Sequence, residues 1–413
     1  MSAVGKATRR TFSALQVRNF RLYFYGQTIS LSGTWMQSLA QGWLVLKLTG
    51  SGVDLGIAVA LAFTPMLIAG SWGGLVVDRL PKRSILFATQ AASAVLALTL
   101  GLLTSLGRAT VWDVFVMAFL LGIVNLFDNP ARQAFVQEMV GRELLPNAVS
   151  LNSVLVNAGR VIGPAFGGLV IATMGLSACF FVNAVSFVAV IVALALMNES
   201  ELLPIRTVAR DKGQLRAGFR YAFGHKEIRS ILLAVGVVGI FAYNFTVSLP
   251  LLIKNTFGGN AGTYGVFMAA MGIGAILGGL LVAHRSRPSA GLAAALCLVF
   301  GLLVAGLALS PNEVVALIMV VPMGAASIAF ISTANATLQL ITAEEMRGRV
   351  MALYAIAFLG STPIGAPLIG VICTVFTPRV GLAVGGVATI LAAGALIYVA
   401  RGGTHAPVEI AAS

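Results

Sequence analysis

Residues 147–172 read NAVSLNSVLVNAGRVIGPAFGGLVIA, a nearly uninterrupted run of uncharged side chains. From Leu151 to Ala172 the one charged side chain is Arg160, and all the others are apolar, small or uncharged. About 20 such residues in a helix cross the ~30 Å hydrocarbon core of a bilayer. Lipid offers the backbone no hydrogen-bond partners, so a run of this length must be an α-helix. The stretch therefore predicts a membrane-spanning helix that carries one positive charge inside the membrane.

Apolar runs of this kind recur along all 413 residues, of which 58% are hydrophobic and 10% are charged. A soluble protein carries about 25% charged residues, so the composition excludes a water-soluble globule. Twelve runs are predicted as spans: 22–46, 55–77, 84–105, 112–133, 147–172, 176–197, 229–253, 262–283, 290–309, 313–339, 350–375 and 380–400. We expect an all-α membrane protein with 12 transmembrane helices.

The basic residues are distributed unevenly between the two sides that these spans define. If the N-terminus is cytoplasmic, 22 of the 27 Lys and Arg residues lie on the cytoplasmic side, among them Lys6, Arg9 and Arg10. Only four lie on the opposite side: Lys47, Arg108, Lys254 and Arg379. Cytoplasmic loops carry such an excess, so both termini are expected in the cytoplasm. The net charge of +13 is therefore a signal of topology and does not indicate nucleic-acid binding, which needs one clustered basic patch.

A polar stretch, residues 198–228, divides the predicted helices into six and six. It predicts an N-terminal six-helix bundle over 1–197, a cytoplasmic linker over 198–228 with a short amphipathic helix, and a C-terminal six-helix bundle over 229–413. The bundles resemble each other: GGLVVDRLPKR begins at Gly73 and GGLLVAHRSRP at Gly278, an offset of 205. Two pseudo-symmetric bundles with a central site are typical of secondary transporters.

Polar residues form a stripe along the first predicted helix. They follow one another at steps of three or four and so share one helix face: Gln27, Ser30, Thr34, Gln37 and Gln41. Such a face either lines a water-filled substrate cavity or forms hydrogen bonds with partner helices, and its length favours the cavity. Other helices contribute further candidates for substrate binding or coupling: Asn125, Asp128, Arg132, Asn157, Arg160, Asn335 and Gln339.

Arg160 needs a partner, because a charge at the bilayer centre costs at least about 2.5 kcal/mol. Asp128 is the one acid well inside any predicted helix. It can pair with Arg160, or with Arg132 one turn further along its own helix. Three hypotheses stay open: Arg160 binds an anionic substrate, it forms a switchable network with Asp128, or it makes a purely structural pair.

Two short motifs predict moving contacts. At the cytoplasmic end of the second predicted helix a basic turn contains Gly74, Asp78, Arg79 and Arg83. The carbonyl groups at a helix C-terminus attract cations, so this turn can bind to the ends of neighbouring helices. The alternative is that it is a solvated loop. The fifth predicted helix carries small residues and a proline: Gly159, Gly163, Pro164, Gly167 and Gly168. Small residues allow close helix contact and proline allows bending, so these residues predict a gate.

The same motifs resemble those of the major facilitator superfamily. GGLVVDRLPKR is similar to its Gly-x-x-x-Asp-Arg-x-Gly-Arg-Arg signature, with Pro81 in place of the glycine. GRVIGPAFGG resembles its helix-5 antiporter motif, although Ser150 replaces the first glycine. The segment FDNPARQAFVQEMV looks like the bacterial branch that contains the enterobactin exporter and drug and macrolide efflux proteins. Ala118 stands where proton-coupled members carry an arginine, so the usual coupling arginine is missing.

These features together predict a secondary transporter with the major facilitator fold. It would export a small molecule, a siderophore by preference, across the bacterial inner membrane by alternating access, with proton antiport implied by the resemblance. Multidrug or macrolide efflux is the alternative, and a solute importer or a non-transporting membrane sensor is less favoured. We expect no enzyme activity, cofactor or metal; the partners would be a small molecule of anionic character, protons and the bilayer. Three cysteines in separate apolar runs indicate no disulfide framework.

Overall fold

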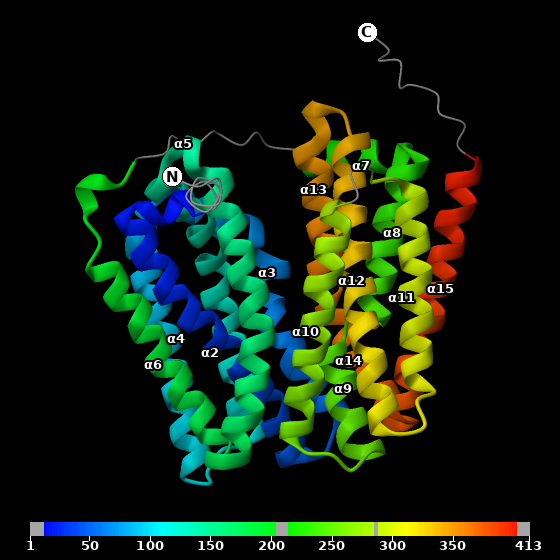
Figure 1. Ribbon diagram of the computed structural model, residues 1–413, viewed down its shortest axis with the longest axis horizontal. Helices are drawn as coiled ribbons and strands as arrows, with labels where there is room; N and C mark the ends of the chain where they lie inside the picture. The colour runs from blue at the N-terminus through cyan, green and yellow to red at the C-terminus, as the bar shows by residue number, and fades with distance from the viewer. Residues whose placement is uncertain (1–11, 204–213, 285–287, 403–413) are drawn as a thin grey trace, which may run out of the picture. The chain divides into compact units, whose positions relative to one another are not determined.

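The computed structural model describes residues 12–203, 214–284 and 288–402, and these residues form helices joined by short turns, without a β-strand (Figure 1). Lys6, Arg9 and Arg10, which entered the charge count, lie outside the described residues, as do 204–213 of the predicted linker and Arg285 and Arg287. The all-α class predicted from the apolar runs is confirmed.

The α-helices in chain order are α2 (Arg18–Thr49), α3 (Gly52–Arg79), α4 (Lys82–Ser105), α5 (Val111–Met174), α6 (Leu176–Ala195), α7 (Gln214–Gly224), α8 (Lys226–Phe241), α9 (Phe245–Leu251), α10 (Ala261–His284), α11 (Ala290–Ala308), α12 (Glu313–Ile341), α13 (Glu344–Leu359), α14 (Thr362–Val375) and α15 (Pro378–Gly402). Two short 3-10 helices, η1 (Ser13–Gln16) and η2 (Glu199–Glu201), and one π-helical turn, η3 (Leu252–Thr256), complete the described elements.

Ten helical segments of the described chain are long and apolar enough to cross a membrane. Two of the predicted runs, 112–133 and 147–172, share one of these segments, the 64-residue α5. α5 is interrupted at Gly141, whose φ of 70° is accessible to glycine but strained for other residues. α2 covers the first predicted run but is not among the ten, and its polar stripe lowers its hydropathy. The predicted number of twelve spans therefore stays a prediction.

Two predicted spans are broken into two helices each. The run 229–253 becomes α8 and α9, and Asn244 at the break donates from Nδ2 to the carbonyl of Ile240 at 2.7 Å. The run 350–375 becomes α13 and α14, and Ser361 at that break donates to the carbonyl of Phe358 at 2.6 Å. Side chains thus hydrogen-bond carbonyls next to both interruptions, which reduces the cost of breaking a helix in lipid. Hydropathy alone does not reveal such breaks.

The chain divides into two compact units. Unit 1 contains Met1–Arg210, Phe245–Gly272 and Ala366–Pro378, and unit 2 contains Asp211–Asn244, Ile273–Gly365 and Arg379–Ser413. Unit 1 therefore includes two segments from the second half of the sequence. In unit 2, α7 packs on α13: Gly218 lies against Arg349, and the Tyr221 hydroxyl accepts a hydrogen bond from the backbone N–H of Ala343.

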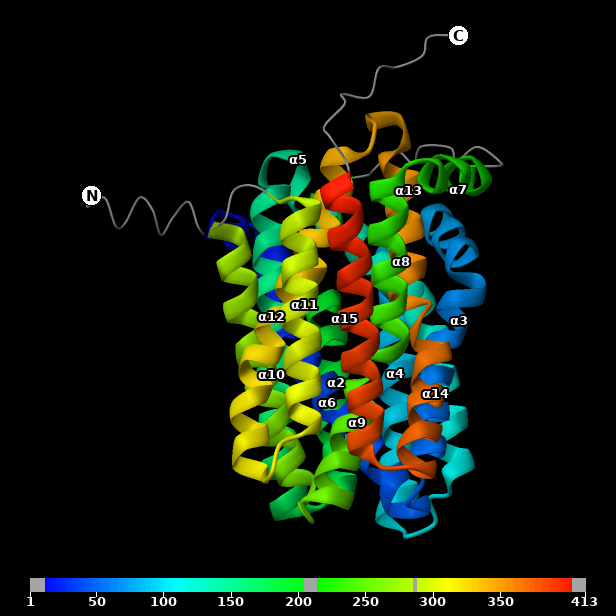
Figure 2. The same ribbon diagram turned by 90° about the vertical axis from the view of Figure 1, so that its right-hand side faces the viewer.

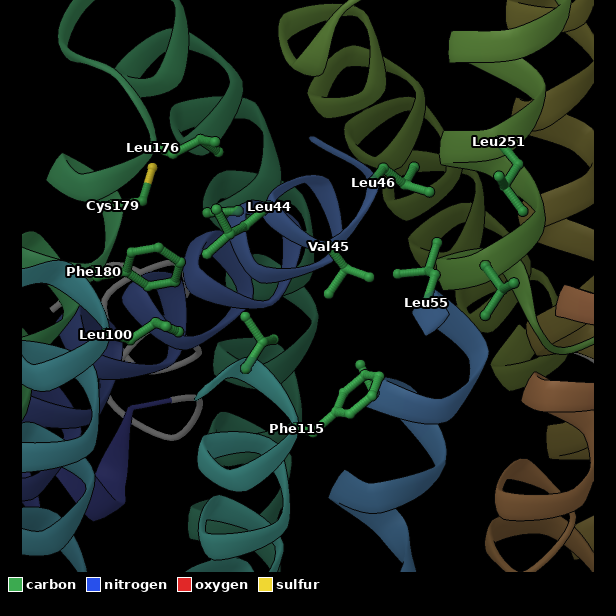
Figure 3. Close-up of a cluster of buried hydrophobic side chains, with 14 of the residues drawn as sticks. Leu44, Val45, Leu46, Leu55, Leu100, Phe115, Leu176, Cys179, Phe180 and Leu251 are labelled. Atoms are coloured by element: carbon green, nitrogen blue, oxygen red, sulfur yellow. The ribbon is translucent and has the colours of Figure 1, made fainter. Parts of the chain in front are cut away.

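The core of unit 1 joins these distant segments. Figure 3 shows Leu251 of α9 in one apolar cluster with Leu46 of α2 and Leu55 of α3, and all three side chains are buried. Local signals place the helix ends beside this core. Thr110 and Asp113 form a reciprocal capping box at the start of α5, and Gly50, with φ of 66°, ends α2.

Close backbone contacts hold the helices of each unit, and some of them follow the sequence repeat. Gly73 of α3 packs against Leu126 of α5 in unit 1, and Gly278 of α10 packs against Ala325 of α12 in unit 2. These two glycines are the pair that the offset of 205 aligned. Figure 2 shows α11 and α12 beside each other in unit 2, where they pack extensively. Small residues at equivalent positions thus allow close helix packing in both halves.

Candidate functional site

Asp128 of α5 is the centre of a buried polar network in unit 1. Its carboxylate oxygen Oδ1 accepts hydrogen bonds from Thr89 Oγ1 at 2.7 Å and from Gln90 Nε2 at 2.8 Å, both on α4. Its Oδ2 forms an ion pair with Arg132, one turn along the same helix. Arg132 also donates from Nη1 to Gln27 Oε1 of α2 at 2.8 Å. Three helices therefore meet at one buried carboxylate, whose exposed fraction is 2%.

This network unites several predicted residues and adds two that sequence reasoning missed. Asp128, Arg132 and Gln27 were predicted site residues, whereas Thr89 and Gln90 were not. The available signal was a polar pair inside an otherwise apolar run of α4. Arg132, one of the two arginines considered as partners of Asp128, forms an ion pair with it. A charged pair of this kind is stable in a low-dielectric interior only when its remaining atoms are hydrogen-bonded as well.

Arg160 of α5 has a different setting. Its guanidinium carbon lies 5.1 Å from the centroid of the Trp35 ring on α2, within the range of a cation–π contact. The side chain is half-buried. Its own backbone is tightly packed, because Gly272 of α10 approaches Val161 and the carbonyl of Arg160. The geometry thus presents a cation on an aromatic face, at a place where α2, α5 and α10 meet.

The polar stripe of α2 divides between packing and exposure. Gln27, Ser30 and Gln37 are buried, whereas Thr34 is exposed and Gln41 is half-buried. Gln37 Oε1 accepts a hydrogen bond from Asn183 Nδ2 of α6 at 2.7 Å, and Asn183 in turn accepts one from Ser186. Thr34 bonds only within its own helix, to the carbonyl of Ser30. Interhelical hydrogen bonding therefore accounts for Gln27 and Gln37, and Thr34 and Gln41 are the members with solvent-accessible surface.

The remaining candidates are not among the residues that hydrogen-bond to Asp128 in the described part of the chain. Asn157 is half-buried and donates to the carbonyl of Ser153 in its own helix. Asn125 is half-buried on α5. Asn335 and Gln339 lie in unit 2, where Gln339 Nε2 donates to Asn335 Oδ1 at 2.5 Å. Within the described residues, no group of three or more His, Cys, Asp or Glu side chains is placed to hold a metal ion.

The glycine motif of α5 has two packed faces in unit 1. Gly159, Gly163 and Gly167 lie against α2, and an added Cβ at Gly163 would stand 2.6 Å from the carbonyl oxygen of Ser32. Gly168 and the carbonyl of Pro164 lie against α10, where a Cβ on Gly265 would stand 2.6 Å from Pro164 O. The motif thus packs α5 closely against helices from both halves of the sequence.

A second contact of this kind joins α3 to α14 in unit 1. A Cβ on Gly56 would stand 2.8 Å from the Cα of Pro367, and the backbone N–H of Gly52 donates to Thr374 Oγ1 at 3.0 Å. Nearby, Lys254 of η3 donates to the carbonyl of Leu46, in the last turn of α2, at 2.6 Å. Cations are stabilised at helix C-termini, so this lysine fastens η3 to the end of α2.

In the basic turn after α3, Arg83 and Lys82 contact neighbouring helices. Arg83 donates from Nε and Nη2 to the carbonyl of Leu194 at the C-terminal end of α6, and it pairs with Glu199. The Nζ of Lys82 lies 4.0 Å from Oε1 of Glu138 on α5 and donates a hydrogen bond to the carbonyl of Asp78. Gly74 and Asp78 are half-buried and Arg79 is exposed. Arg83 is therefore the member of the turn that holds a neighbouring helix end.

Comparison with solved structures supports the fold. The chain matches a bacterial homolog of the human lysosomal transporter Spinster, in an inward-facing and unoccupied conformation, with a TM-score of 0.71 and 15% identity over 93% of this chain and 95% of that one. It also matches a POT family transporter in complex with 5-aminolevulinic acid, with a TM-score of 0.73 and 10% identity over 93% and 96% of the chains. At these identities the likeness concerns the fold alone.

Comparison with characterised proteins identifies relatives that are named as a transporter, an efflux pump and an exporter. The chain is 27% identical to the staphyloferrin A transporter of Staphylococcus aureus over 63% of its length and 66% of that protein's, which is just under two thirds. It is 26% identical to the multidrug efflux pump Tap of Mycolicibacterium fortuitum, over 82% and 85% of the two chains. It is also 26% identical to the enterobactin exporter EntS of Shigella boydii, over 87% and 86%.

The family model for transmembrane secretion effectors matches residues 9–406, nearly the whole chain. The match agrees with the helical spans and with the small-molecule transporters among the relatives. The chain therefore belongs to the transmembrane secretion effector family of the major facilitator superfamily and is a multi-pass membrane transporter.

Proposed function

We propose that this transporter exports a small anionic molecule, with siderophores as the favoured class, across the bacterial inner membrane in exchange for protons. The observation that carries the proposal is the Arg160 guanidinium over the Trp35 ring. A guanidinium binds carboxylate or catecholate oxygens through a two-pronged hydrogen-bonded contact, and an aromatic face beneath it keeps the fork oriented. Relatives that carry the names staphyloferrin A transporter and enterobactin exporter support this substrate class.

Asp128 is the proposed proton carrier. It is the buried carboxylate of unit 1, and its charge is balanced by Arg132. Protonation would remove that balance, so it would weaken the hold on Arg132 and, through it, on Gln27 of α2. A change of charge at one side chain would thus reach a second helix, as alternating access requires. The charge distribution supports both termini in the cytoplasm.

Multidrug or macrolide efflux is the second candidate. The similarity to the multidrug efflux pump Tap covers 82% of this chain, more than the similarity to the staphyloferrin A transporter. Broad-specificity efflux would depend on apolar contact more than on one arginine. The two candidates therefore differ in how much transport depends on Arg160.

Uptake into inverted membrane vesicles separates them. We expect a tricatecholate and a citrate-type siderophore to be transported, and Arg160→Ala to reduce that transport about 100-fold, the effect of losing about 3 kcal/mol of a charge-assisted contact. Arg160→Lys should retain part of it, because the charge stays while the fork is lost. Arg108→Ala, which alters an exposed arginine, is the control. Transport of a neutral macrolide or a lipophilic cation that is insensitive to Arg160→Ala would favour multidrug efflux instead.

A further inference from the structure

The network around Asp128 contains four buried atoms that form no hydrogen bond within the described part of the protein: Tyr23 Oη, Gln27 Nε2, Gln90 Oε1 and Arg132 Nε. The side chains of Tyr23, Gln27 and Gln90 have exposed fractions of 1%, 0% and 1%. A buried polar atom without a partner is costly, and native interiors rarely contain several in one place. Such a group indicates that something else completes the hydrogen bonds.

The four atoms belong to one cluster. Arg132 donates to Gln27 at 2.8 Å, and Gln90 and Arg132 hold opposite oxygens of the same carboxylate. Tyr23 lies one helical turn from Gln27 on α2, and its hydroxyl interacts electrostatically with Arg132 and Asp128. The ring of Tyr23 also packs edge to face against that of Phe135, which lies about one turn beyond Arg132. The two ring centroids are 6.2 Å apart. All of these contacts lie within unit 1.

The hydrogen-bonding character of the four atoms is determined by their neighbours. Gln27 uses its amide oxygen to accept from Arg132, so its free atom is the NH2 donor. Gln90 uses its NH2 group on the carboxylate, so its free atom is the oxygen acceptor. Arg132 Nε–H is a donor, and the Tyr23 hydroxyl both donates and accepts. The cluster thus offers two donors, one acceptor and one group of either kind.

That set matches water, which accepts two hydrogen bonds and donates two. We propose that Tyr23, Gln27, Gln90 and Arg132 enclose a site for ordered water, and that this water carries protons to and from Asp128. The second part rests on the proposed proton exchange. In that step a hydronium ion transfers one proton to a carboxylate oxygen of Asp128, which leaves a neutral water and a neutral carboxylic acid.

One member of the cluster is partly exposed. The Arg132 side chain is 20% exposed, whereas that of Asp128 is 3% exposed. The charged and titratable groups that the described helices bring to Asp128 are Arg132 on its own helix and Tyr23 on α2. From α4 it receives only the neutral Thr89 and Gln90. Water beside Arg132 would therefore lie between this half-buried side chain and the buried carboxylate.

Tyr23→Phe tests the site, because it removes an oxygen that bonds no protein atom and changes the ring little. If the hydroxyl holds water, we expect the melting temperature of the purified protein in detergent to fall by about 2 °C, as for a lost hydrogen bond. If the cluster is dry, removal of an unpaired buried hydroxyl leaves the melting temperature unchanged or raises it, and this result overturns the site. Tyr25→Phe is the matched control, since Tyr25 lies on the same helix with 59% exposure.

A second measurement tests the carrier role. At a pH low enough to protonate Asp128, infrared spectroscopy follows its carboxylic acid band, identified by its loss in Asp128→Asn, as the solvent is changed to D2O. We expect Tyr23→Phe to slow the hydrogen–deuterium exchange of this band, and proton-driven transport, about tenfold. A lower melting temperature with unchanged exchange supports the water site and overturns the carrier role. If the wild-type protein moves no protons, the proposed exchange fails, while the melting comparison still decides whether water is bound.

Discussion

At the scale of single residues, Asp128 and Arg160 have separate environments, and each environment suits a different task. Asp128 is buried, hydrogen-bonded by two neutral side chains and ion-paired with Arg132. Arg160 is half-buried over an aromatic ring. The carboxylate of Asp128 joins side chains of two helices through one charged and two neutral contacts, whereas a cation on an aromatic platform is suited to hold an anion.

Asp128→Asn tests the residue scale. The amide still bonds α4 but cannot carry a negative charge, so substrate should no longer drive proton movement in proteoliposomes that contain a pH-sensitive dye. Because Arg132 loses its counter-charge, we also expect a loss of stability of about 3 kcal/mol, which the double variant Asp128→Asn/Arg132→Gln should partly restore. Glu143→Gln changes an exposed acid of the same helix and serves as the control. Unchanged proton movement in Asp128→Asn would assign coupling to another group.

At the scale of helices, the space around a glycine decides whether a larger residue can replace it. Gly163 of α5 lies against the backbone of α2, whereas Gly236 of α8 has open space where a Cβ would stand. Gly163→Ala should therefore lower stability by about 1–3 kcal/mol, since an overpacked backbone contact cannot yield locally, and it should slow transport. Gly236→Ala should raise stability by up to about 1 kcal/mol, because alanine favours helix more than glycine does. Thermal unfolding in detergent measures both, and equal shifts would refute the close-packing argument.

At the scale of the whole molecule, unit 1 is assembled from segments that are far apart in the sequence. Lys254 reaches the carbonyl of Leu46 at a sequence separation of 208 residues. Lys254→Met should cost about 1 kcal/mol, as for a partly buried cation at a helix C-terminus, and it should loosen η3 from α2. Lys47 is exposed in the last turn of α2, and Lys47→Met should change the free energy of unfolding little. Cysteine cross-linking of η3 to the end of α2 measures the loosening, and equal yields in both variants would show that Lys254 does not hold this contact.

Much of the fold could be predicted, because in a bilayer the position of each helix depends mainly on its own segment of sequence. Each apolar run must satisfy its own backbone, so hydropathy locates helices such as α3, α4 and α11 within a few residues. The same argument missed the breaks at Asn244 and Ser361, because side-chain hydrogen bonds to nearby carbonyls offset the cost there. It also placed the two predicted runs of α5 without locating the kink at Gly141.

The candidate site could likewise be predicted in part. Composition and spacing were enough to predict a helical membrane protein, two charges within its apolar runs at Asp128 and Arg160, and a glycine motif that allows close packing. The three-dimensional arrangement was needed to show that Arg132 pairs with Asp128, that Thr89 and Gln90 complete the pair, and that Gln37 hydrogen-bonds to α6. The physical reason is that hydropathy and spacing are properties of one helix. A hydrogen-bond partner depends on how far each neighbouring helix is rotated and shifted, and no single helix carries that information.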